Sequence, residues 1–309
     1  MNYNPRDWRK LWLLKFNSGL LHEILWRMVG CVAGAVVITV LYECGCRWGL
    51  GWTNLVVTGQ QRPAIVPLAA HSLAGVALGL LLVLRTNASY DRFWEGRRLW
   101  GSITNESRNL ARQVIVLLGG DRVLQSRALD WIVVLPYTVM NQLYGGATVA
   151  AVAERLPAGA GSALLQSQHP PLAAAAELTS LLAEARGRGL ISDLVFVALD
   201  QNVNQLVDYL GGCERIHRTP LPFAYGVHLR LALLAYCCTL PLPLVQEFSW
   251  WTIPAVALIT YILFGIDEIG LEIENPFGGT SHDLPLEEFC QRIEQNVREL
   301  QANRPIKLA

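Results

Sequence analysis

The residue types that most often perform chemistry are thinly spread along this chain. Its histidines lie far apart, at positions 22, 71, 169, 217, 228 and 282, and no two have the i, i+4 spacing of a metal-binding helix. There is no G-x-S-x-G nucleophile elbow, no P-loop and no G-x-G-x-x-G following a strand. These absences argue against an enzyme, and we expect neither a catalytic residue nor a cofactor.

Two groups of ionisable residues remain as candidate sites. Asp267, Glu268, Glu272 and Glu274 follow the last apolar run, and carboxylates can bind a hard cation. The alternative, which we favour, is a solvated helix end whose acids pair with nearby arginines. His71 lies inside an apolar run, where an ionisable side chain is a candidate functional residue. Its alternative is a neutral imidazole bonded to the backbone of a neighbouring helix.

The elements around these residues have the composition of a membrane protein. The chain is 52% hydrophobic and 16% charged, whereas soluble domains carry about 25% charged residues. The run from Pro63 to Leu84 has no Asp, Glu, Lys or Arg and matches the roughly 20 residues that a helix needs to cross a bilayer. Four such transmembrane helices are predicted, at about 28–42, 63–84, 231–245 and 250–266. The last two form a hairpin, and Pro241 and Pro243 predict a break in the first of them.

A fifth uncharged run, from Trp131 to Ala153, has a poor composition for a lipid-facing helix, because it contains Pro136, Asn141 and Gln142. We favour buried helices of a cytosolic domain over a span. With four spans, every basic segment lies on one side of the membrane, so the N- and C-termini are predicted to be cytoplasmic.

The predicted organisation is therefore all-α. Residues 1–84 hold an N-terminal segment and transmembrane helices 1 and 2, and residues 85–223 form a cytosolic helical region. Residues 224–270 hold transmembrane helices 3 and 4, and residues 271–309 form a cytosolic C-terminal segment. The formal net charge is zero, so no basic field favours nucleic acid as a partner.

Three blocks of sequence resemble the signature motifs of the bestrophin family, in its bacterial branch. They read RTNASYDRFWEGRRLWG at 85–101, GCERIHRTPLPFAY at 212–225 and ENPFGGTSHDLPL at 274–286. Their order, spacing and intervening hydropathy also fit, so the resemblance covers nearly the whole chain. The motif residues to which it gives a structural role are Arg85, Asn87, Tyr90, Asp91, Arg92, Trp94, Glu214, Arg215, Pro220, Pro222, Asn275, Pro276, Phe277, Gly278 and Asp283.

The resemblance implies a homopentamer with one central ion pore in the bacterial inner membrane. The second span of each subunit would line an apolar neck at Ala69, Leu73 and Ala77, or include Leu81 if the register shifts by one turn. A second, cytosolic constriction would lie at about Leu194. The family tends to place bulky isoleucine or phenylalanine in the neck, so the two alanines imply a wider one.

The function that follows is a passive ion channel. Its partners would be the lipid bilayer, permeating inorganic ions and further copies of itself. The family suggests anions such as chloride, while a cation-selective channel of the same architecture is the alternative; a secondary transporter and a membrane scaffold are less favoured. Animal members follow the NPFG turn with a dense acidic run. Because that run is missing here, we expect no metal and no calcium activation of the animal type.

Overall fold

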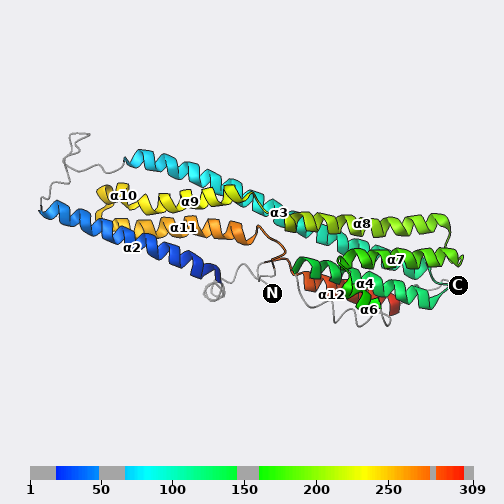
Figure 1. Cartoon of the computed structure of the whole chain (residues 1–309). Helices are drawn as coiled ribbons and strands as arrows, with labels where there is room; N and C mark the ends of the chain where they lie inside the picture. The colour runs from blue at the N-terminus through cyan, green and yellow to red at the C-terminus, as the bar shows by residue number, and fades with distance from the viewer. Residues whose placement is uncertain (1–18, 49–66, 145–159, 279–282, 303–309) are drawn as a thin grey trace. The chain divides into compact units, whose positions relative to one another are not determined.

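The computed structural model describes residues 19–48, 67–144, 160–278 and 283–302, and all the elements within these ranges are helices. This confirms the all-α prediction (Figure 1). In chain order the elements are α2 (Gly19–Trp48), α3 (Leu68–Leu117), α4 (Arg122–Tyr144), α6 (Ala160–Gln166), α7 (Pro170–Gly187), α8 (Asp193–Arg218), α9 (Phe223–Thr239), α10 (Pro241–Phe248), the 3₁₀ helix η1 (Ser249–Trp251), α11 (Thr252–Glu272) and α12 (Leu286–Ala302).

The helices divide between two compact units. Unit 1 extends to Tyr90 and resumes from Leu221 to Glu274; unit 2 comprises Asp91 to Pro220 and the chain from Asn275. Helix α3 is unbroken and contributes its first part to unit 1 and its second part to unit 2.

Unit 1 contains the segments that are long and apolar enough to cross a membrane. Among the described residues these are Ile24–Cys44, the start of α3, and Phe223–Glu272. The last segment is not one straight helix, because α9 ends at Thr239 and α10 begins at Pro241. Proline lacks a backbone N–H and fits the first turn of a new helix. The predicted break at the prolines is thus confirmed, while the number of spans remains a prediction.

Helices α3 and α9 of unit 1 contact each other where the ring of Tyr236 on α9 packs against Gly75 on α3. The rings of His71 and Tyr236 are stacked, with centroids 4.4 Å apart and planes at 11°. One turn further along α3, a Cβ on Gly75 would lie 3.0 Å from Cζ of Tyr236 and closer still to its hydroxyl. A hydrogen atom at position 75 therefore lets the tyrosine ring lie against the helix backbone.

The core of unit 2 is built around α4. Every side chain from Trp131 to Met140 is buried there, Pro136 included. The described part of the fifth uncharged run is therefore a buried helix of unit 2, as its polar residues predicted. Helices α7, α8 and α12 supply further buried apolar residues to the same core, among them Leu178, Leu206 and Ile293.

Candidate functional site

The predicted neck residues all lie on the first half of α3. Ala69, Leu73 and Ala77 are exposed, with Leu73 at 72%, and Leu81 is half-buried. Their i, i+4 spacing places them along one side of the helix. The carbonyl of Leu81 accepts a hydrogen bond from the hydroxyl of Tyr225 at 3.2 Å, which ties this turn of α3 to α9. An apolar row is thus left uncovered within one chain.

The predicted cytosolic constriction, Leu194, lies in the first turn of α8, in unit 2. Its side chain is 82% exposed. The hydroxyl of Ser192 caps this helix by accepting from the backbone N–H of Val195 at 3.4 Å. A polar cap of this kind satisfies one of the free N–H groups at the helix start.

The first motif block begins with a buried arginine that pairs with a buried aspartate. Arg85 on α3 is 3% exposed and forms a hydrogen-bonded ion pair with Asp267 of α11, which is 1% exposed. Arg27 of α2 and Arg230 of α9 also approach Asp267, at 3.8 and 3.7 Å. The guanidinium of Arg85 further lies 3.7 Å from Glu274. Four helices of unit 1 therefore meet at one carboxylate.

This network corrects one interpretation of the acidic cluster. Pairing with arginines is confirmed, since Arg27 lies 3.3 Å from Glu268 as well as near Asp267. The solvated helix end is wrong for Asp267, because the helices around it exclude water from its side chain. Within the described ranges no group of three or more His, Cys, Asp or Glu residues could hold a metal ion. The arginines supply the compensating charge that a cation would otherwise provide.

The first and second motif blocks contact each other inside unit 2. Arg92 donates to the carbonyls of Ile216 and Thr219, at 2.7 and 2.6 Å, at the C-terminal end of α8. Glu95 lies one turn further along α3 and forms an ion pair with Arg215 at 2.6 Å. Cations are favourable at helix C-termini, where carbonyls lack partners. The two blocks therefore hold α8 against α3.

Two neighbouring groups in the second block have structural contacts. Glu214 lies 3.0 Å from the imidazole Nε2 of His169, the residue that precedes α7. Cys213 is fully buried, and burial raises the pKa of its thiol to about 12. The thiol therefore stays protonated at neutral pH and is a poor nucleophile. Cys213 therefore packs in the core, and Glu214 connects α8 to the start of α7 through His169.

The third motif block forms a turn that lies against α3. Phe277 is buried, and a Cβ on Gly96 would lie 3.0 Å from its ring and 3.1 Å from Pro276. The side-chain oxygen of Asn275 accepts from the N–H of Phe277 at 3.3 Å. The carbonyl of Pro276 accepts from the N–H of Leu284 at 3.1 Å, which brings the chain back toward the turn. A side chain at position 96 would therefore press on this turn, and glycine suits its close approach.

The remaining motif residues have diverse positions. Asp283 is close to the turn, since a Cβ on Gly278 would lie 3.0 Å from its Oδ2. Pro222 occupies the position directly before α9 and makes no side-chain capping hydrogen bond. Several others have exposed side chains and do not belong to the buried core: Asn87, Tyr90, Asp91, Trp94 and Pro220.

Arg27 and Arg230 contribute to the buried network although neither lies in a motif block or in the acidic cluster that the sequence singled out. Each is a single basic residue at the edge of an apolar run. An isolated arginine in that position is usually read as a topology signal. Only the packing of α2 and α9 on α11 reveals that both face Asp267.

Comparison with known proteins gives consistent matches over most of the chain. The model of the bacterial/fungal bestrophin protein family matches residues 1–299. A voltage-dependent anion channel-forming protein of Nostoc is 34% identical over 309 residues, covering 99% of this chain and 95% of the relative. Another, from Synechocystis, is 32% identical over 301 residues, covering 96% and 92%.

The structural comparison agrees. The crystal structure of a bacterial bestrophin homologue from Klebsiella pneumoniae has 28% sequence identity and a TM-score of 0.81, covering 91% of this chain and 100% of that one. These matches extend beyond the three motif blocks to the helices between them. The chain belongs to the bestrophin family, in its bacterial and fungal branch.

Proposed function

We propose that this protein is a passive ion channel that conducts anions such as chloride through the central pore of a homopentamer. The observation that carries the proposal is the exposed apolar row of Ala69, Leu73 and Ala77 on α3. Arg85 on the same helix is buried in an ion pair that anchors it to α11. The names of the relatives, which describe anion channel-forming proteins, support the choice of ion.

In this proposal conduction needs no catalytic residue. Ions lose part of their hydration shell in a neck formed by Ala69, Leu73, Ala77 and Leu81, and an apolar neck restricts passage by its size and by dewetting. Leu194 forms the cytosolic constriction. The neck residues carry no charge, so the sign of the permeant ion depends on charged groups elsewhere along the pore. For this reason a cation-selective channel of the same architecture remains the alternative.

The proposal places unit 1 in the lipid bilayer of the bacterial inner membrane. Its apolar helices agree with a membrane location. Both termini are on the cytoplasmic side, as the distribution of basic residues predicts. Residues 85–223 and 271–309 are then cytosolic, and copies of the chain surround a common axis.

The decisive test is the reversal potential of the purified protein in planar bilayers under a KCl gradient. A shift toward the chloride equilibrium potential supports the proposal, and a shift toward that of potassium establishes the cation-selective alternative. Absence of any current from protein shown to be pentameric would contradict an intrinsically open pore.

The neck residues can be tested separately with a matched pair of variants. Leu73→Ala should change conductance or selectivity without preventing assembly. Leu258→Ala on α11 is the control, because Leu258 is also an exposed leucine of unit 1, at 61%. If currents through Leu73→Ala match those of the wild type, the neck assignment is wrong.

A further inference from the structure

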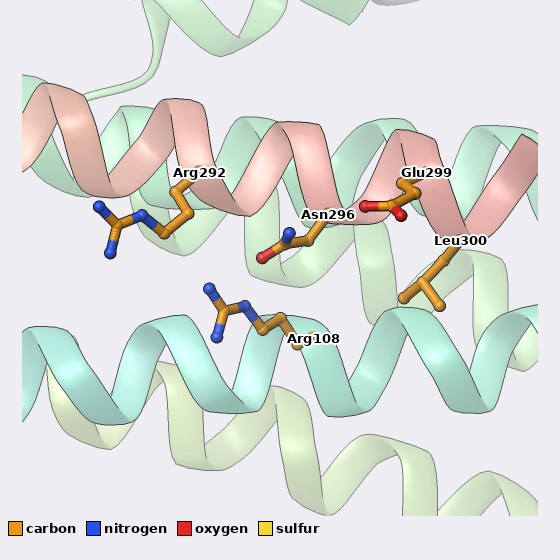
Figure 2. A pocket seen from close by; sticks show the side chains of 5 residues that line it. All are labelled: Arg108, Arg292, Asn296, Glu299 and Leu300. Atoms are coloured by element: carbon orange, nitrogen blue, oxygen red, sulfur yellow. The ribbon is translucent and has the colours of Figure 1, made fainter.

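Unit 2 contains a pocket whose chemistry the channel function does not use. The pocket lies between α3 and α12 and has a volume of about 590 Å³. Arg108 lines it from α3, and the other lining residues come from α12 (Figure 2): Arg292, Asn296, Glu299 and Leu300. The α12 residues are spaced by three and four positions, so they lie along one side of the helix.

The two arginines meet at the same end of the pocket. Figure 2 shows the side chains of Arg108 and Arg292 extending into the gap from opposite helices, with the amide of Asn296 beside them. Glu299 and Leu300 lie toward the other end. The pocket is therefore polar and cationic at one end. The carboxylate of Glu299 and the apolar side chain of Leu300 lie at the other end.

The positive charge at this end is not neutralised within the described part of the chain. Arg108 and Arg292 form no ion pair there, and the buried Nε of Arg108 has no hydrogen-bond partner. Other arginines near α12 are engaged: Arg298 pairs with Asp130 at 2.9 Å, and Arg97 lies 4.8 Å above the ring of Phe289. A buried donor without an acceptor is costly. Two like charges facing a recess therefore point to an anionic ligand.

Guanidinium groups match planar or tetrahedral oxyanions well. Their forked donors bind carboxylate and phosphate oxygens in a bidentate manner. The amide of Asn296 can donate a further hydrogen bond. The volume lies within the range of small-molecule sites, about 300 to 1,000 Å³.

We propose that the pocket between α3 and α12 binds a soluble small molecule bearing a phosphate or carboxylate group, held by Arg108, Arg292 and Asn296. The proposal is independent of the channel function, because the pocket lies wholly within unit 2 and needs no permeating ion. It gives the cytosolic region of this protein a ligand site of its own.

The test is isothermal titration of the full-length protein in detergent with sodium phosphate, sodium citrate and sodium chloride at matched ionic strength. We expect saturable binding of phosphate or of citrate, and no saturable binding of chloride. Phosphate alone would assign the phosphate class, and citrate alone would assign the carboxylate class. Saturation by neither oxyanion would overturn the proposal, and so would equal binding of chloride.

Substitutions locate the site. Arg108→Gln and Arg292→Gln should each weaken binding about tenfold, the expected loss for a charge-assisted hydrogen bond. Arg112→Gln is the control, because Arg112 is an exposed arginine one turn along α3 that does not line the pocket. Equal losses in Arg108→Gln and Arg112→Gln would overturn the proposal in favour of diffuse surface charge.

Glu299→Gln provides a variant that should gain affinity. Removing the carboxylate lowers the repulsion of an anionic ligand, so inorganic phosphate or citrate should bind more tightly than to the wild type. Unchanged elution volume and unchanged ligand-free melting temperature would show that each variant is folded. Weaker binding by a folded Glu299→Gln would contradict the proposed location.

Discussion

The two units of this protein bury opposite kinds of groups. Unit 1 leaves large apolar side chains such as Leu73 and Leu258 exposed and buries the charges of Arg85 and Asp267. Unit 2 buries its apolar residues around α4 and keeps most of its ion pairs, for example Arg215 with Glu95, at the surface. The same polypeptide is therefore stabilised by different interactions in its two parts.

The difference follows from the surroundings that each unit requires. Lipid solvates exposed leucines as well as a protein core does, so apolar burial contributes little to the association of helices in a membrane. A buried ion pair there selects one arrangement of α3 and α11. In water the hydrophobic effect provides the main driving force. Substitutions that remove a charge from unit 1 or an apolar group from unit 2 should reveal this contrast.

The largest effect is expected from Asp267→Ala in unit 1. The substitution leaves the buried guanidinium of Arg85 without its main partner, which typically costs about 3–5 kcal/mol. Thermal unfolding in detergent, followed by circular dichroism, measures the loss. Glu268→Ala is the control and should cost much less, because Glu268 is more exposed, at 15%, and pairs with the partly exposed Arg27 rather than with the buried Arg85. Equal losses from the two variants would contradict a central role for Asp267.

The corresponding change in unit 2 is Leu178→Ala. Leu178 on α7 is fully buried, and truncation of a buried leucine costs about 2–5 kcal/mol through lost burial and the cavity left behind. Denaturant unfolding of the full-length protein, followed by circular dichroism, measures this cost. Leu172→Ala, at an exposed position on the same helix, should stay within about 0.5 kcal/mol of the wild type. A small effect of Leu178→Ala would show that apolar packing is not what holds unit 2 together.

An intermediate effect is expected for Arg92→Gln, which tests the contact between the first and second motif blocks. The substitution removes the charge that bonds the carbonyls of Ile216 and Thr219 at the end of α8. The expected loss is about 1–2 kcal/mol. Hydrogen exchange should show faster exchange in the last turn of α8 and unchanged exchange in α4. Uniformly faster exchange across unit 2 would argue against a local capping role.

The smallest expected effect is a pH dependence of the stability of the folded protein. It comes from the carboxylate of Asp121, the residue that precedes α4. The carboxylate accepts hydrogen bonds from the N–H groups of Leu124 and Val123, each at 3.0 Å, and pairs with Arg188. These contacts lower the pKa of Asp121 below its usual value, with the bond from Leu124 as the largest cause. The stabilisation is therefore present above the unfolded-state pKa of about 4 and is lost as the pH falls through the lower folded value.

Comparison of melting temperatures checks this sign. The wild type should be more stable than Asp121→Asn at pH 7, and the difference should shrink as the solution becomes more acidic than about pH 4. Asp208→Asn, at an exposed position of α8, should show no such difference. A gap between wild type and Asp121→Asn that persists in acid would exclude the carboxylate charge as its origin.

The sequence predicted those features that depend on local pattern. Apolar runs predicted the helices of unit 1, the prolines at 241 and 243 predicted the break after α9, and the polar residues of the 131–153 run predicted the burial of α4. The motif blocks predicted the family, because their spacing is specific.

Features that depend on packing between distant segments could not be predicted in the same way. Nothing near Asp267 in the sequence indicates that Arg27 and Arg230 approach it, since each lies on a different helix. That Arg108 and Arg292 line the same pocket likewise depends on how α12 lies beside α3. Charge alone did not distinguish these residues from arginines that simply face water.

The contact between Gly75 and Tyr236 has a consequence for how this protein can evolve. Any side chain at position 75 must displace the tyrosine ring, which is already held by its stacking on His71. We therefore expect a larger residue at 75 to be accommodated best when the residue at 236 is smaller. The two positions should covary among bestrophin sequences, with the bulk lost at one matched by the bulk gained at the other.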